Sequence, residues 1–142
     1  PYVVGAPLGD TVSALLLGAL QKSIRTGENE ILPAGTPDAP DTVILGESVT
    51  SRSLAAALLL DYGLCAEVIC PVELPRELEG SFCRQIEDEQ DLQAALSGAR
   101  RVIADPLFAP IVPQGAQFFP LPHEAYSGRI YRRQILNLVT TW

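Results

Sequence analysis

The amino-acid sequence predicts an α/β protein, a Rossmann-like three-layer domain with a mainly parallel sheet of about four strands flanked by helices. The first observation is the order of segments from Thr42 onward, where short apolar runs alternate with longer helix-forming stretches. The second is composition, because 47% of the residues are hydrophobic and 19% are charged, as in globular proteins. The third is length, since a chain of 142 residues can bury roughly two thirds of its unfolded surface. We therefore expect residues 1–142 to form a single domain.

Residues 42–64 are the centre of this prediction. Thr42–Leu45 is a short apolar and β-branched run typical of a buried strand, and it stops at Gly46. After a turn rich in hydroxyl groups, Leu54–Leu60 is an uninterrupted block of helix-forming residues. Gly63 stands where the left-handed end of a helix is favoured. A strand followed so closely by a helix is the first half of a βαβ unit.

Residues 1–32 are expected to form an N-terminal segment and a helix. The opening PYVVG suits a strand or an extended segment, and Asp10 is placed to cap a helix that ends at Gly27. Three prolines within residues 33–41 exclude a helix or a central strand, so this stretch is predicted to be a connector. The side chains expected on the inward face of the helix are Leu15, Leu16, Ala19, Leu20 and Ile24.

Residues 42–142 are expected to hold a βαβαβ core and a C-terminal helix. An acidic first turn favours a helix that ends at Gly98, because the charges complement the helix dipole. The last helix is expected to start at Ser127 or Gly128 and to run to Thr141. Its inward side chains would be Ile130, Ile135, Leu138 and Val139. The remaining strands are expected at Cys65–Cys70, Arg101–Ala104 and Gln117–Phe119.

Charge and hydropathy argue against two classes of partner. The net charge is −7 with only ten Lys and Arg, so no basic surface for nucleic acid is expected. No apolar run approaches the roughly 20 residues that span a bilayer, and no signal-peptide pattern is present. We therefore expect a soluble, cytoplasmic protein without membrane contact. The chain begins at Pro1 and contains no Met, so we also expect a processed chain or a piece of a longer one.

Ligands of an open parallel sheet bind beyond the carboxyl ends of its strands. The turn after the first core strand could bind an anion through helix N–H groups, assisted by Ser48, Thr50 or Ser51. It lacks the GxGxxG and P-loop patterns, and Glu47 would repel a phosphate. Hydroxyl groups that cap a helix explain residues 48–53 without any ligand. The other predicted strand ends lie at Cys70–Val72, Asp105–Leu107 and Pro120–His123.

His123 is the only histidine, and it lies in a loop predicted at the same edge. A lone histidine in a loop is more often a hydrogen-bonded structural residue than a metal ligand or a general base. Neither a Ser-His-Asp set nor a Cys-His pair can be assembled from the sequence. Cys65, Cys70 and Cys83 have no CxxC spacing, so buried thiols are favoured over a metal site. Five positions separate Cys65 from Cys70, which places them on opposite faces of a strand.

Three stretches resemble one family. They are PYVVGAPLGDTVSALLLGAL at residues 1–20, VILGESVTSRSLAAALLLDYGL at 43–64 and AYSGRIYRRQILNL at 125–138. In order, they resemble a segment that opens a helix, a strand-turn-helix, and a Y-S-G segment followed by a helix. The chain is similar in this respect to oxidoreductases of the nitrogenase component 1 type. That family includes the MoFe protein subunits, cofactor-assembly scaffolds, and the dark-operative protochlorophyllide and chlorophyllide reductases.

The resemblance implies that this chain is the C-terminal portion of such a subunit. The family's bridging-cluster cysteines lie earlier in the subunit, so this fragment would hold no cofactor alone. An iron–sulfur or related metallocluster would be present only in the full-length protein. The resemblance places His123, as metal ligand, with Tyr126, Ser127 and Gly128 at the cofactor. Ser48 is the further cofactor-binding candidate.

Three functions remain open from the sequence. The first is the C-terminal domain of a nitrogenase component 1-like oxidoreductase subunit, inactive alone. It would contribute to a metallocluster or tetrapyrrole cavity and to an interface with other subunits or with a second copy. The second is a small-ligand-binding α/β module that uses the turn at residues 48–53. The third is a structural or dimerisation domain that has lost its cofactor.

Overall fold

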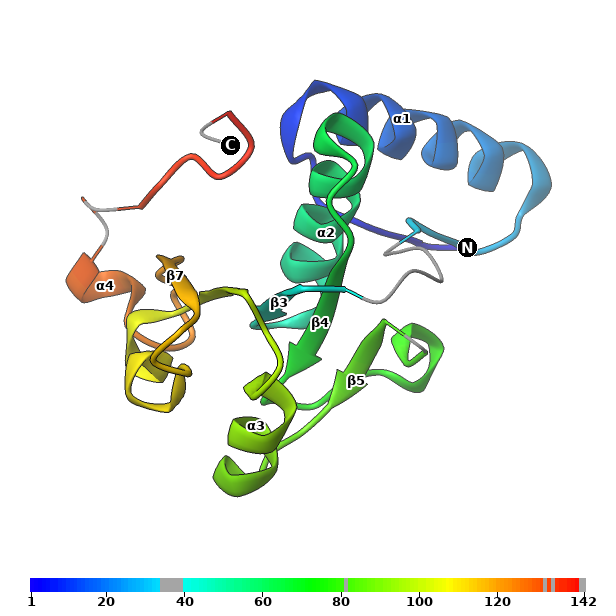
Figure 1. Cartoon of the computed structure of the whole chain (residues 1–142). Coiled ribbons are helices and arrows are strands. Elements are labelled where there is room, and N and C mark those ends of the chain that lie inside the picture. The colour runs from blue at the N-terminus through cyan, green and yellow to red at the C-terminus, as the bar shows by residue number, and fades with distance from the viewer. Residues whose placement is uncertain (34–39, 81, 132, 134, 141–142) are drawn as a thin grey trace.

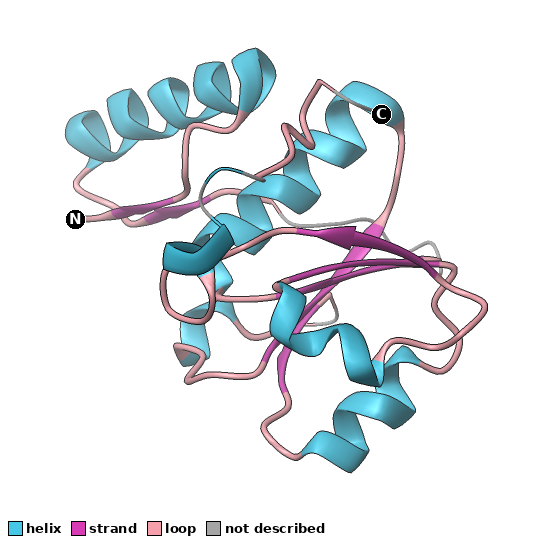
Figure 2. Ribbon diagram, turned by 90° about the vertical axis from the view of Figure 1, so that its left-hand side faces the viewer, coloured by secondary structure: helices cyan, strands magenta, loops and turns pink. Residues whose placement is uncertain are grey.

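The computed structural model describes residues 1–33, 40–80, 82–131, 133 and 135–140 (Figures 1 and 2). Most of the predicted connector, residues 34–39, lies outside the described residues. The main element is a sheet of five parallel strands in the order β5-β4-β3-β6-β7. This confirms the predicted fold class. The strands are β3 (Thr42–Leu45), β4 (Ala66–Cys70), β5 (Cys83–Gln85), β6 (Arg101–Ala104) and β7 (Gln117–Pro120).

Strand β5 is the one core strand that the sequence did not predict. Its residues Cys83, Arg84 and Gln85 include two exposed polar side chains, so no apolar run marks the strand. It lies at the edge of the sheet and pairs only with β4. An edge strand can carry polar side chains because solvent reaches it. The short 3₁₀ turn η1 (Arg76–Leu78) lies in the connection before it.

Helices cover both faces of the sheet and make three layers (Figure 1). Helix α2 (Ser48–Tyr62) packs on one face, while α3 (Glu89–Leu96) and the 3₁₀ segment η2 (Pro106–Ile111) cover the other. Side chains of β3 alternate between these two cores, because successive strand residues point to opposite faces. Ile44 packs with the α2 residues, and its neighbours Val43 and Leu45 pack with the α3 residues.

The N-terminal part forms a second, smaller unit (Figure 2). Strands β1 (Val3–Val4) and β2 (Glu30–Ile31) pair in parallel, and α1 (Gly9–Thr26) connects them. The helix ends as predicted at Gly27, whose φ of 74° is left-handed. The prediction that Asp10 caps α1 is wrong, because the capping position is Leu8 and Asp10 lies in the first turn.

The predicted inward face of α1 is wrong in part. Leu16 and Ala19 pack against the buried Val12, which itself contacts alanines of α2. Leu20 is 41% exposed and Ile24 is 81% exposed, and Leu15 is exposed as well. The reason is geometric: α1 packs on α2 and on the two short strands, so it covers a narrower stripe than its apolar face.

The predicted C-terminal helix is also wrong in part. Helix α4 spans only Gly128–Tyr131. Ile130 and Ile135 are exposed, whereas Leu138 is buried and Val139 packs against the core on the α2 face. The Tyr62 hydroxyl of α2 donates a hydrogen bond to the Val139 carbonyl at 2.6 Å. The chain end is therefore attached to α2 without a continuous helix. Among the described helices, none has the length and hydropathy needed to cross a bilayer.

Candidate functional site

The order of strands reverses between β3 and β6. From β3 the chain passes through α2 to β4 on one side, and later returns through α3 to β6 on the other side. Open α/β sheets bind ligands in the crevice outside the carboxyl ends of the strands at this reversal. Leu45 and Ala104 end the two strands as direct neighbours. The residues that follow them, including Glu47 and Asp105, therefore border the expected ligand position.

Asp105 holds the loop at residues 123–128 against the end of β6. Its Oδ2 accepts hydrogen bonds from the backbone N–H of His123 at 2.8 Å and of Ser127 at 3.2 Å. Its Oδ1 accepts one from the Ser127 hydroxyl at 2.6 Å and one from the Leu107 N–H at 3.0 Å. The side chain is 1% exposed, so these four donors replace the water that the carboxylate has lost. We call this arrangement the Asp105 clamp.

The pKa of Asp105 reflects two opposing effects. Burial penalises the charged carboxylate and on its own would raise the pKa. The hydrogen bonds from Ser127, His123 and Leu107 stabilise the same charge and outweigh burial, so the pKa lies below its ordinary value. At neutral pH the clamp therefore carries a negative charge at the end of β6.

Ser127 and Gly128 of the Y-S-G sequence fix the conformation of the loop at residues 123–128. Ser127 is buried and supplies two of the donors to Asp105. A Cβ on Gly128 would lie 2.7 Å from the carbonyl carbon of His123, so only glycine fits there without a shift of backbone. The Gly128 N–H also donates to the His123 carbonyl at 2.8 Å. Both predicted site residues thus shape the loop that presents their neighbours.

The His123 imidazole caps its own loop. Its Nδ1 accepts a hydrogen bond from the Ala125 N–H at 3.1 Å, so the neutral ring carries its proton on Nε2. Asp105 bonds the backbone of His123 and the side chain of Ser127, which is not the arrangement of a Ser-His-Asp triad. Histidines that bind metals almost always donate from the second ring nitrogen. In its present orientation His123 is thus a hydrogen-bond donor through Nε2, and metal ligation would require the ring to turn.

Tyr126 places a buried hydroxyl near the same strand ends. Among the described residues its Oη has no hydrogen-bond partner. Its ring lies edge-to-face on Phe108 with 5.3 Å between centroids. Burial raises the pKa of Tyr126 to about 12, and the negative charges of Glu47 and Asp105 add to the effect. At neutral pH the hydroxyl is therefore a protonated donor with an unmet hydrogen bond, which is costly unless a ligand or water satisfies it.

A cavity of about 380 Å³ lies beside the ring of Tyr126. It is bounded by η2, the start of α3 and Pro71 after β4. Its size and mostly apolar walls fall within the range of small-molecule sites. The apolar walls include Phe108, Leu92, Leu107 and Ile111, and the two carboxylates are those of Glu87 and Glu89.

Residues 47–53, predicted to form a turn, are instead the N-cap and first turns of α2, and the chain itself satisfies the N–H groups at this end of the helix. Glu47 caps α2, and its carboxylate accepts hydrogen bonds from the N–H groups of Val49 at 2.8 Å and Thr50 at 2.5 Å. The prediction that hydroxyl groups cap this helix is therefore wrong. Ser53 Oγ instead donates to the Val49 carbonyl and accepts from the Ala6 N–H, both at 2.8 Å. Ser48 is buried in the first turn, where a carboxylate already occupies the position an anion would take.

The structure brings together four of the five predicted site residues, His123 with Tyr126, Ser127 and Gly128, and places Ser48 at the neighbouring strand end. Sequence reasoning missed Asp105 as the residue that assembles them, although its place after a predicted strand was the available signal. In the described part of the chain, no group of three or more His, Cys, Asp or Glu side chains is arranged to hold a metal ion. Comparison with protein-family models, curated proteins and solved structures gave no match to this chain.

Proposed function

We propose that this chain is the C-terminal domain of a nitrogenase component 1-like oxidoreductase subunit. It would contribute one wall of a metallocluster or tetrapyrrole cavity and part of a subunit interface, and would be inactive alone. The observation that carries the proposal is the Asp105 clamp, which fixes a Y-S-G loop at the reversal point of the sheet. Ligand sites of such sheets lie at this point.

The loop supplies donors suited to such a wall. His123 offers its Nε2–H, and the Tyr126 hydroxyl is a buried donor without a partner among the described residues. One imidazole cannot hold a cluster, so the remaining ligands would come from the rest of the full-length protein. A bound metallocluster would supply electrons to a substrate in the cavity. Residues of this chain would orient that group and exclude water from one side.

Exposed apolar side chains support the proposed interface. Leu17 and Ile24 of α1 are 61% and 81% exposed, and Ile130 of α4 is 78% exposed. Side chains of this size add stability when another surface removes them from water. We infer that other subunits of a nitrogenase-like complex, or a second copy of the chain, cover them in the cytoplasm.

The test is the iron content and visible absorbance of the full-length protein, purified anaerobically as wild type, His123→Ala and His123→Asn. The asparagine is the matched control, because its side-chain oxygen can still accept from the Ala125 N–H as Nδ1 does. It lacks a counterpart of Nε2. If His123 faces the cofactor, both variants lose or shift the cluster absorbance, while His123→Asn keeps the thermal stability of the wild type.

Two results would contradict this proposal. A full-length protein free of iron and of tetrapyrrole would remove the cofactor-cavity function. Equal iron and equal spectra in all three proteins would show that His123 only caps its loop, and the wall would have to be built by other residues.

A second function, binding of a small molecule, is favoured by the cavity beside Tyr126. The helix N–H groups of the turn at residues 48–53 are already engaged, so the ligand would bind in that cavity and not in the turn. Aromatic walls and two carboxylates suit a flat organic cation. Calorimetry should then detect tryptamine but neither indole-3-propionate nor phosphate, and Phe108→Ala should weaken tryptamine binding. If calorimetry detects no binding of tryptamine, this second function is contradicted.

A further inference from the structure

Cys70 and Cys83 meet on neighbouring strands of the main sheet. Cys70 is the last residue of β4 and Cys83 the first of β5, and Cys83 is paired in register with Val68. Cys70 is two residues beyond Val68, so the two cysteines are diagonal neighbours on the same face of the sheet. Both are buried in the core on the α2 face.

The two thiols are hydrogen-bonded to each other, and Arg52 of α2 is hydrogen-bonded to Cys83. Two carbonyl groups hold the guanidinium in place. Its Nη1 donates to Leu78 O and its Nη2 to Leu32 O, both at 3.1 Å. A fixed positive charge therefore lies against one sulfur of the pair.

This arrangement gives the two thiols different pKa values. The hydrogen bond from Cys70 and the charge and hydrogen bond of Arg52 together outweigh burial and lower the pKa of Cys83 to about 7. The same hydrogen bond and burial raise the pKa of Cys70. Arg52 contacts Cys83, so Cys83 is the sulfur that becomes a thiolate and Cys70 is the one that keeps its proton. A thiolate beside a second thiol is the arrangement of oxidisable cysteine pairs.

We propose that Cys83 and Cys70 form a peroxide-oxidisable pair, in which Cys83 is oxidised first and Cys70 then closes a disulfide between β4 and β5. In the first step the Cys83 thiolate attacks one oxygen of a hydroperoxide. An S–O bond forms, the O–O bond breaks, and the departing alkoxide takes a proton to become an alcohol. The sulfur loses two electrons to the hydroperoxide and becomes a sulfenic acid.

In the second step the Cys70 sulfur attacks the sulfur of the Cys83 sulfenic acid. The S–S bond forms as the S–O bond breaks, and the departing hydroxide leaves as water with the proton of Cys70. The sum is one dithiol and one hydroperoxide converted to one disulfide, one alcohol and one water. A thiol such as glutathione reverses the oxidation by exchange.

The edge position of β5 permits this closure. Diagonal neighbours lie about 7–8 Å apart between Cα atoms, whereas a disulfide requires about 4.4–6.8 Å. Closure of the disulfide would draw β5 toward β4. Strand β5 has three residues, pairs on one side only, and follows a turn closed by two hydrogen bonds between Gly80 and Cys83. Local separation of this short edge strand from β4 would also give the oxidant access to Cys83.

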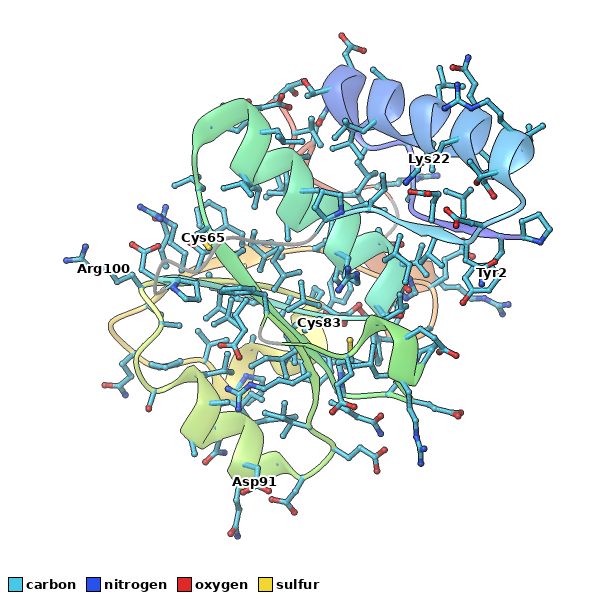
Figure 3. All side chains as sticks on the ribbon, turned by 90° about the vertical axis from the view of Figure 1, so that its right-hand side faces the viewer. Tyr2, Lys22, Cys65, Cys83, Asp91 and Arg100 are labelled. Atoms are coloured by element: carbon cyan, nitrogen blue, oxygen red, sulfur yellow. The ribbon has the colours of Figure 1, made fainter. Side chains whose placement is uncertain are left out.

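The third cysteine is a built-in control. Cys65 precedes β4 and so lies at the opposite end of that strand from Cys70. Figure 3 shows Cys65 apart from Cys83. The thiol of Cys65 is more exposed than the other two. If exposure alone decided reactivity, Cys65 would be the main target of peroxide.

The test is hydrogen peroxide treatment of the native protein, followed by alkylation and peptide mass spectrometry. We expect a Cys70–Cys83 cross-linked peptide, two hydrogens lighter than the dithiol form, in the wild type and in Cys65→Ser. Dithiothreitol should remove the cross-link. In Cys70→Ser the reaction should stop at the sulfenic acid, which dimedone labels on Cys83.

Substitutions of Arg52 test how strongly its positive charge controls the oxidation rate of Cys83. With a pKa of about 7, about half of Cys83 is thiolate at pH 7, against about 3% for an ordinary thiol of pKa about 8.5. A thiolate of lower pKa is also a weaker nucleophile, which offsets part of this gain. Oxidation should therefore be about threefold slower or more in Arg52→Gln. Arg52→Lys keeps the positive charge but cannot make both bonds of the guanidinium to Leu78 O and Leu32 O, so its rate should lie between those of Arg52→Gln and the wild type.

Three outcomes would overturn the proposal. The first is absence of the Cys70–Cys83 peptide in the native wild type and in Cys65→Ser. The second is dimedone labelling of Cys70 in Cys83→Ser as fast as that of Cys83 in Cys70→Ser. The third is equal oxidation rates in Arg52→Gln and the wild type when circular dichroism shows both to be folded.

Discussion

Glu47 and Asp105 occupy equivalent places at the ends of two neighbouring strands. Glu47 stabilises the start of a helix, whereas Asp105 stabilises the position of a loop. Each follows a core strand and accepts hydrogen bonds from backbone N–H groups. Glu47 bonds residues two and three positions ahead of it and starts its own helix. Asp105 also bonds residues 18 and 22 positions ahead, and so fastens a separate loop to the sheet.

The difference separates a local function from a long-range one. A helix cap is satisfied within one turn of chain, and losing it frays only that turn. The Asp105 clamp closes a loop of about twenty residues, and the bound loop carries every predicted site residue except Ser48. Three experiments can break or sharpen this comparison.

The largest effect is expected for Asp105→Ala. Removing the carboxylate leaves its buried donors, among them the N–H groups of His123 and Ser127, without a partner, and each unsatisfied donor is costly. The free energy of unfolding, measured with urea, should fall by about 3 kcal/mol or more. Ser127→Ala removes only one of the bonds and should cost about 1–2 kcal/mol. A loss for Asp105→Ala as small as that for Ser127→Ala would mean that the loop is held by other contacts.

A smaller effect is expected for Glu47→Ala. The variant loses the cap of α2 but leaves the helix packed on the sheet, so the free energy of unfolding should fall by about 1 kcal/mol. Glu47→Asp is the control, because aspartate is a favoured capping residue and should restore most of the loss. If Glu47→Ala costs as much as Asp105→Ala, the distinction between a local and a long-range carboxylate fails.

The smallest effect is expected for the dependence of the free energy of unfolding on acidic pH. The pKa of Asp105 is lower in the folded protein than in the unfolded chain, where it is about 3.9. Its charge therefore stabilises the fold above that pH, and the contribution disappears as the pH falls through the lower, folded value. The difference in unfolding free energy between wild type and Asp105→Asn should be constant near neutrality and should narrow below about pH 4. A gap that stays constant down to pH 2.5 would show that the charge contributes nothing.

The fold followed from local signals, so most of it could be predicted. An apolar run marked strand β3, which lies where expected. Helix α2 ends at the expected glycine, but it begins at Ser48, inside the stretch that was predicted to be a turn. Strand β5 could not be found this way, because Arg84 and Gln85 are exposed at an edge. A pattern of apolar residues indicates buried positions, and an edge strand with polar side chains has few buried positions.

The helical faces show the limit of the same signal. The apolar pattern of α1 predicts a broad covered face, but the structure supplies only α2 and two short strands to cover it. Ile130 looked like an inward residue of a long helix, yet α4 is a single turn and the side chain is exposed. The apolar pattern of a helix indicates the surface that the helix could bury. It does not show whether a neighbouring element covers that surface.

The candidate site was predictable in position but not in construction. The rule that ligands bind beyond the carboxyl ends of parallel strands pointed to the loop around His123, and Asp105 holds that loop there. The pairing of Asp105 with Ser127 could not be read from the sequence, because 22 positions separate them. The meeting of Cys70 and Cys83 depends in the same way on the unpredicted strand β5.

The two edges of the main sheet also limit how this protein can associate with others. At one edge β5 is only three residues long, and at the other β7 ends in Pro120, which has no N–H to offer a further strand. Short or proline-bearing edges are poor templates for the sheet-to-sheet growth that leads to fibrils. Any assembly is therefore expected to form through helices and loops. The apolar side of α1 offers such a surface without extending the sheet.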